Sequence, residues 1–185
     1  GGIRHFLQFA DFNRAELEGF AARLGVEGKG GHALDQVMLH CAADKLFLSA
    51  DQVLSKSSPN VSVWAVEPDQ NSLGEYLASL ASLTTTLPYD VMVLPGHGVP
   101  FYGLKTRIKQ LADHHEDRCR LIADACREVP QTSRELVPVV FNKYPLDVHQ
   151  MGFASGELIA HVNYMLNEGR LTSEVTDGVL RFRTT

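Results

Sequence analysis

KLFLSADQVL, residues 45–54, is a short apolar run that ends in a carboxylate, Asp51. DVMVLPGHG, residues 90–98, repeats the pattern and ends in a histidine, His97, between two glycines. Short continuous apolar runs are typical of buried strands. We therefore expect two strands that each deliver a potential metal ligand where the chain turns into a loop. This pattern predicts an active-site edge of a sheet.

The composition is that of an ordinary soluble globular protein. Of 185 residues, 44% are hydrophobic and 21% charged, and the net charge of −5 argues against a protein that mainly binds phosphate backbones. No apolar run approaches the roughly 18 residues of a membrane span, and no signal-peptide pattern is present, so we expect a cytoplasmic protein. Cys41, Cys119 and Cys126 form no C-x-x-C pair and are expected to be reduced, structural thiols.

The first part of the chain mixes helix and strand patterns. Asn13 is a candidate cap for a helix that ends at Gly25, and a glycine-rich connector follows at residues 28–31. Apolar residues at helical spacing predict a second helix over residues 72–83. The remaining runs predict strands over residues 36–41, 45–50, 61–66 and 91–94. The first two of these strands are expected to pair as a hairpin.

The second part of the chain is helical and ends in a hairpin. A long charged helix is predicted from Leu104 to Arg127, and a short one follows, capped by Thr132 or Ser133. Asp147 caps a longer helix that reaches about Asn167. Residues 170–183 predict a hairpin with an Asp-Gly turn. Helix, helix, hairpin is the winged-helix order, and the predicted domain boundary lies near residue 103.

The order of the motifs carries a family resemblance. GHALDQ at residues 31–36, FLSADQVL at 47–54 and LPGHG at 94–98 together resemble the second half of a metallo-β-lactamase-fold hydrolase. The chain from Leu104 onward resembles the C-terminal winged-helix extension of the β-lactamase-like subgroup. The resemblance implies an α+β fold in which residues 1–103 hold half of an αββα sandwich with an N-terminal helix. Residues 104–185 then form a winged-helix-like domain.

The resemblance also implies a metal site. Members of this family hold two divalent metals, usually zinc, that activate a water molecule at the sheet edge. By position, Asp51 matches the bridging aspartate, His97 matches the last ligand histidine, and His32 is a third candidate ligand. Gln36 stands where a ligand histidine is expected, and the HxHxDH motif of the family does not occur in the sequence.

Two functions follow as alternatives. By resemblance the chain is a truncated or degenerate metal-dependent hydrolase of esters, thioesters or phosphodiesters, weakly active or inactive alone. The alternative is a non-catalytic module. An uncovered sheet face would favour packing of two copies as a homodimer. Nucleic-acid binding through the winged helix is a weaker variant, because the candidate recognition helix, Asp147 to Asn167, contains no Lys or Arg.

Other polar residues have ordinary interpretations. Neighbouring residues in the helical run His114-His115-Glu116-Asp117 point about 100° apart, which favours a solvated or domain-facing helix surface over a metal cluster. We interpret His149 and His161 as packing or surface residues. Arg118, Arg120 and Arg127 are candidates for an anion-binding groove, although surface ion pairs with nearby acids are the favoured interpretation.

Overall fold

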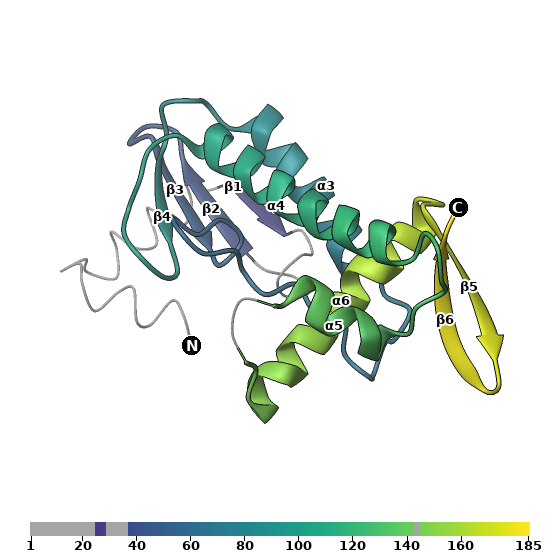
Figure 1. The fold of residues 1–185 in the computed structure, drawn as a ribbon. Helices are drawn as coiled ribbons and strands as arrows, with labels where there is room; N and C mark the ends of the chain where they lie inside the picture. Colours follow the sequence, from purple (N-terminus) through teal and green to yellow (C-terminus); the bar gives the residue numbers. More distant parts are fainter. Residues whose placement is uncertain (1–24, 29–36, 143–144) are drawn as a thin grey trace.

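The structure is a computed structural model that describes residues 25–28, 37–142 and 145–185. Within these residues, a four-stranded sheet lies at one end of the molecule and a two-stranded hairpin at the other, with the helices between them (Figure 1). The helix predicted over residues 14–24 lies outside the described residues, as do His32 and Gln36.

The sheet has the strand order β1-β2-β3-β4, with bounds Gly25–Gly28, Val37–Cys41, Leu46–Ala50 and Met92–Pro95. The predicted hairpin is confirmed, since β2 and β3 pair antiparallel, and β4 joins β3 in parallel. Strand β1 was expected to be a helix end and a connector. Its sequence, GVEG, contains two glycines and has little strand signal, and it forms a strand by pairing with β2.

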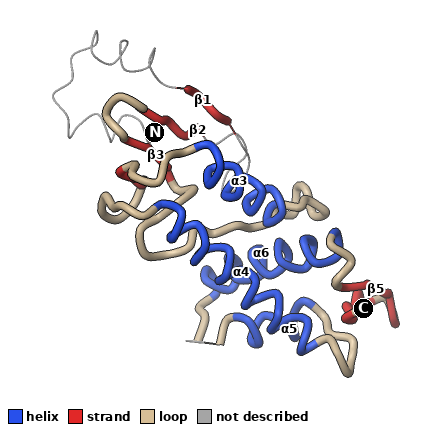
Figure 2. Tube along the Cα trace, turned by 90° about the horizontal axis from the view of Figure 1, so that it is seen from above, coloured by secondary structure: helices blue, strands red, loops and turns tan. Residues whose placement is uncertain are grey.

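Two helices, α3 (Ser72–Thr86) and α4 (Leu104–Ala125), lie on one side of this sheet, as Figures 1 and 2 show. Strand pairing places Phe47 and Val93 on the same sheet face, and both are buried in the apolar cluster that contains Leu80 and Leu104 of the helices. The side chain of Asn71 accepts a hydrogen bond from the N–H of Gly74 and so caps α3. The helix predicted over residues 72–83 is therefore confirmed.

The strand predicted over residues 61–66 is wrong. This segment is a loop in which Val61 and Val63 are buried and Trp64 is 62% exposed. The alternation that resembled a strand arises because the loop lies along a helix, where the N–H of Val63 donates to the carbonyl of Gly156 at 3.0 Å. Burial of alternate residues against a helix gives the same pattern of apolar and polar residues as a strand. The sequence alone therefore does not distinguish the two.

The helical part and the final hairpin follow the predicted order. Helix α5 spans Ser133–Val140, α6 spans Val148–Asn167, and the hairpin consists of β5 (Leu171–Thr176) and β6 (Val179–Thr184). Thr132, not Ser133, caps α5, and Asp147 caps α6; both helices begin with a full capping box. Asp177 and Gly178 both have positive φ, as a tight two-residue turn requires.

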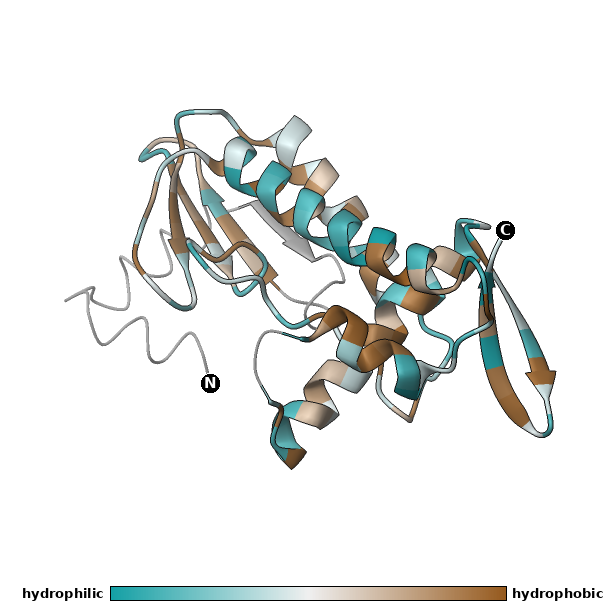
Figure 3. Ribbon diagram, in the orientation of Figure 1, coloured by the Kyte–Doolittle hydropathy of each residue, from teal (hydrophilic) through white to brown (hydrophobic). Residues whose placement is uncertain are grey.

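One buried apolar cluster runs through the described residues from the sheet to the final hairpin. It joins Phe47 of β3, Leu73 of α3, Leu158 of α6 and Phe182 of β6. In Figure 3 the visible side of α4 is largely hydrophilic, whereas most of α5 is hydrophobic. The cluster crosses the predicted boundary near residue 103, which stays a prediction. No described helix is both long and apolar enough to cross a membrane.

Candidate functional site

Asp51 and His97 meet at one edge of the sheet. Strands β3 and β4 run parallel and end at Ala50 and Pro95, so the residues that follow them emerge on the same side. The Nδ1 atom of His97 lies 2.7 Å from the Oδ1 atom of Asp51. The structure thus brings together the two residues that the strand ends were predicted to deliver.

The two glycines that flank His97 are required by this geometry. The N–H of Gly96 donates to the carbonyl of Ala50 at 2.7 Å, and a Cβ atom on Gly96 would lie 2.5 Å from Oδ1 of Asp51. Gly98 has a φ of +90°, and a Cβ atom there would lie 2.6 Å from Oγ of Ser55. The Pro-Gly-His-Gly sequence is therefore explained by close backbone approach and by a left-handed conformation.

The pair is open to solvent on the histidine side. The side chain of His97 is 78% exposed and that of Asp51 is 27% exposed. A carboxylate oxygen accepts hydrogen bonds, so Nδ1 of His97 carries the proton in this contact. In the neutral imidazole the lone pair then lies on Nε2, where it is available to a metal ion or to a proton. A carboxylate that orients an imidazole through Nδ1 is the usual support of a metal-binding histidine.

Asp51 and His97 do not complete a metal site by themselves. A catalytic zinc ion usually takes three protein ligands and a water molecule. Across residues 25–28, 37–142 and 145–185, no group of three or more His, Cys, Asp or Glu side chains is placed to hold a metal ion. The donor set of the described residues therefore does not fit the dinuclear centre that the family resemblance implies.

The helical run from His114 to Asp117 does not converge on one point, as expected. Glu116 forms two hydrogen bonds with Arg170, at 2.8 and 2.9 Å, and Asp117 pairs with Arg120 at 2.5 Å. His115 instead faces the interior, where its ring lies edge-on to that of Tyr76. The run is a helix surface that makes different contacts on each side.

His115 and His161 form a buried pair that no sequence pattern indicates. Both are fully buried, and Nδ1 of His115 lies 3.1 Å from Nε2 of His161. Burial lowers the pKa of His115 to about 2 and that of His161 to about 4. Both imidazoles are therefore neutral near pH 7, and the pair serves packing between α4 and α6. His149 is exposed on α6 and contacts Phe153 edge-on at 4.9 Å.

The three arginines of the predicted anion groove all pair with acids. Arg120 and Arg127 form exposed pairs with Asp117 and Asp124, as expected. Arg118 differs, because its ion pair with Glu157 is largely buried. Its guanidinium also lies 4.8 Å from the ring centroid of Phe141. A carboxylate thus pairs with each of the three guanidiniums.

The three cysteines are buried and free. Burial raises the pKa of the Cys119 thiol to about 12 and also raises the pKa of the Cys126 thiol. Thiols with raised pKa values are poor nucleophiles. The prediction that these cysteines are structural agrees with this environment.

Comparison with known proteins supports the resemblance in both parts of the chain. The profile of the "Metallo-beta-lactamase-like, C-terminal domain" matches residues 119–185. A beta-lactamase domain protein from Burkholderia ambifaria, known from its crystal structure, is 42% identical with a TM-score of 0.83. That match covers 88% of this chain and 48% of the Burkholderia chain.

A second solved structure gives the same correspondence. The chain is similar to a metallo-beta-lactamase family protein from Thermus thermophilus, with 26% identity and a TM-score of 0.73. The match covers 88% of this chain and 49% of the Thermus protein. The chain therefore spans about half the length of each of these relatives.

Proposed function

The chain belongs to the metallo-β-lactamase-like family, and on that premise we propose that it supplies Asp51 and His97 to the site of a metal-dependent hydrolase. The observation that carries the proposal is the 2.7 Å contact between these residues at the joint end of two parallel strands. The substrate class that the family implies is an ester, a thioester or a phosphodiester.

The proposal assigns only part of the site to this chain. Asp51 and His97 provide one carboxylate and one imidazole, and a zinc site needs further donors from outside the described residues. We therefore expect the chain alone to bind divalent metal weakly and to hydrolyse esters at a rate close to the background. The chain would act as the second half of a composite centre.

Metal titration tests this assignment. Co²⁺ is added to the chain and its binding is followed by visible absorption, for the unchanged protein and for the Asp51→Asn and His97→Ala variants. We expect each substitution to weaken binding, whereas His149→Ala, which changes an exposed histidine on α6, leaves it unchanged. If both site variants bind Co²⁺ as the unchanged chain does, Asp51 and His97 do not belong to the metal site.

A second candidate function is assembly as a homodimer through the sheet. Leu39, Leu46, Leu48, Met92 and Leu94 share the sheet face opposite Phe47 and Val93, and each of these five is only partly buried among the described residues. An apolar sheet face of this kind favours packing against another sheet. In a composite hydrolase the same face would pack against the other half of the sandwich.

Light scattering over a range of concentrations tests whether two copies of the chain pack through this sheet face. A homodimer through this face predicts that Leu48→Lys yields a monomer. The matched control is Leu121→Lys, which changes a leucine on α4 that is 44% exposed and leaves the sheet unaltered. An unchanged protein that stays monomeric at every concentration would contradict the dimer.

We assign the order α4, α5, α6 and the β5–β6 hairpin to the winged-helix type. Helix α6, in the recognition position, contains no Lys or Arg and contributes Leu158, Val162 and Met165 to the core. This argues for a packing role over base reading. A salt-sensitive gel shift with duplex DNA would instead support the nucleic-acid alternative.

A further inference from the structure

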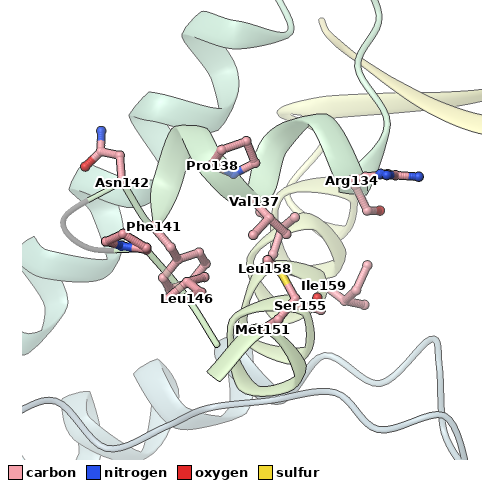
Figure 4. A pocket seen from close by; sticks show the side chains of 12 residues that line it. Arg134, Val137, Pro138, Phe141, Asn142, Leu146, Met151, Ser155, Leu158 and Ile159 are labelled. Carbon is pink, nitrogen blue, oxygen red and sulfur yellow. The ribbon is translucent and has the colours of Figure 1, made fainter. Parts of the chain in front are cut away.

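A large apolar groove lies between α5 and α6. Its volume is about 980 Å³, near the upper end of the usual range for small-molecule sites. Figure 4 shows Val137 and Leu158 at its centre and Phe141 and Leu146 at one end. Val137 and Leu158 are almost fully buried, so the groove has a solid apolar floor that the core already holds in place.

Two prolines lie along the groove, one in α5 and one just before α6. Helix α5 has only eight residues and carries Pro138 on the side of the groove. Pro145 also lines the groove, just before the cap of α6. Proline has no N–H and fixes φ, so these positions restrict how closely the chain can close over the groove. Pro138 and Pro145 thus have a fixed φ at the positions where they line the groove.

Arg134 gives the groove its charge. It stands at the end away from Phe141 and Leu146 (Figure 4), and no acidic side chain lines the groove among the described residues. Other arginines nearby are paired with carboxylates, as Arg118 is with Glu157 and Arg181 is with Glu135. No described carboxylate forms an ion pair with Arg134. A guanidinium without a described acidic partner, beside an apolar channel, favours one negative charge on an otherwise apolar ligand.

We propose that the groove between α5 and α6 binds an amphipathic monocarboxylate, with its hydrocarbon part against Phe141, Leu146 and Met151 and its carboxylate on Arg134. A fatty-acid-type carboxylate has this distribution of charge. The guanidinium donates two parallel hydrogen bonds to a carboxylate, and the apolar floor takes the chain out of water. This inference does not depend on Asp51 and His97, neither of which lines the groove.

Calorimetric titration with dodecanoate, below the concentration at which it forms micelles, tests the proposal on the whole chain. We expect saturable binding by one molecule, weakened roughly three- to tenfold in Arg134→Gln, which keeps a polar side chain but removes the charge. Arg127→Gln is the matched control, because Arg127 is an exposed arginine outside the groove. Dodecanol, which has the same chain and no charge, should bind the unchanged protein and Arg134→Gln equally.

A second variant tests the apolar part. Ser155 lines the groove from α6 and is partly buried, so Ser155→Phe fills the channel without altering its floor. We expect this variant to lose dodecanoate binding while its circular dichroism spectrum is unchanged. The proposal is overturned if dodecanoate binds Arg134→Gln and Arg127→Gln equally, or if no saturable binding occurs. It is also overturned if Ser155→Phe only abolishes self-association, since the groove would then belong to an interface between copies.

Discussion

His161 links the backbone of its own helix to His115 on α4. Its Nδ1 atom lies 2.7 Å from the carbonyl oxygen of Glu157, and its Nε2 atom lies 3.1 Å from Nδ1 of His115. A carbonyl can only accept, so Nδ1 of His161 donates and its Nε2 accepts from His115. Both rings are thereby fixed as neutral tautomers in which Nδ1 carries the hydrogen. A second proton on Nε2 of His161 would remove the acceptor and break this link between α4 and α6.

The first prediction is that acid destabilises the protein through this pair. In the folded state the pKa of His115 is about 2 and that of His161 about 4, mainly because of burial, and Arg118 and His114 lower both further. An unfolded histidine titrates near 6.5, so the unfolded state binds more protons as the pH falls below that value. At pH 5 each buried imidazole should lower the free energy of unfolding by about 2 kcal/mol relative to neutral pH.

Urea denaturation at pH 5 and pH 7.5 measures this effect. The double variant His115→Leu/His161→Leu should lose most of the difference between the two pH values, whereas His149→Leu should keep it, because His149 is exposed. Glu157 acts in the opposite direction, since burial raises the pKa of its carboxyl and favours proton uptake by the folded state. The double variant retains Glu157, so the comparison isolates the imidazoles. An equal pH dependence in all three proteins would contradict the prediction.

The second prediction concerns the buried ion pair of Arg118 and Glu157. Their side chains are 16% and 10% exposed, and Arg118 also contacts the ring of Phe141. Arg118→Ala should therefore destabilise the fold by about 3 to 5 kcal/mol, because it leaves the Glu157 carboxylate buried without its partner. Arg120→Ala, which breaks an exposed pair with Asp117, should cost at most about 1 kcal/mol. Thermal or urea denaturation of the two variants measures the difference.

A compensating variant separates charge from packing. Adding Glu157→Gln to Arg118→Ala removes the uncompensated carboxylate and should restore part of the lost stability. If the double variant is as unstable as Arg118→Ala alone, the loss comes from packing on Phe141 and not from the buried charge.

The third prediction uses two glycines of α6. A Cβ atom on Gly156 would lie 3.1 Å from atoms of Ser62 and from the carbonyl of Val63, whereas a Cβ atom on Gly152 would meet nothing within 4 Å. Gly156→Ala should push the loop off the helix and destabilise the fold by about 1 to 3 kcal/mol. Gly152→Ala should stabilise it by roughly 0.5 to 1 kcal/mol, because alanine is the better helix former. Opposite shifts in melting temperature would confirm the contact, and equal shifts would contradict it.

The loop at residues 61–66 also shows why part of the fold could not be predicted from the sequence. Local signals were sufficient where each element has its own caps and period, as for α6 with Asp147 at its start or the hairpin with its Asp-Gly turn. The segment at residues 61–66 alternates apolar and polar side chains for a different reason, since it packs on a helix much later in the chain. Short strand β1 exists only through pairing with β2. Such long-range contacts leave no periodic signal in one sequence.

The candidate site, too, was predictable from the sequence only in part. Two apolar runs that deliver Asp51 and His97 predicted one edge of a sheet, and the structure places those side chains in contact. The pairing of His115 with His161 was not predictable, because the partners lie on different helices and each alone resembles a core histidine. The groove between α5 and α6 was also missed, since it depends on how two helices are spaced. Motifs on neighbouring strands are predictable; sites built from helix packing are not.

The last prediction concerns the approach of Gly96 to Asp51. A side chain at position 96 would clash with Oδ1 of Asp51, which lies 2.5 Å from the Cβ position. Backbone atoms of Ala50 lie 3.2 and 3.3 Å away and leave no room on that side, so the Asp51 side chain has to move. Gly96→Ala should therefore displace the Asp51 carboxylate and break its hydrogen bond with Nδ1 of His97.

Long-range proton–nitrogen NMR of the histidine rings detects this change. In the unchanged protein the carboxylate favours the tautomer with the proton on Nδ1, and in Gly96→Ala the ring of His97 should shift toward the Nε2-protonated form that is usual in water. Gly152→Ala, remote from the sheet on α6, should leave the His97 signals in place. Weaker Co²⁺ binding by Gly96→Ala than by Gly152→Ala would follow if Asp51 orients His97 for a metal ion. Unchanged His97 signals in Gly96→Ala would mean that the strand end can absorb the added methyl group and that the glycine is not needed for the contact.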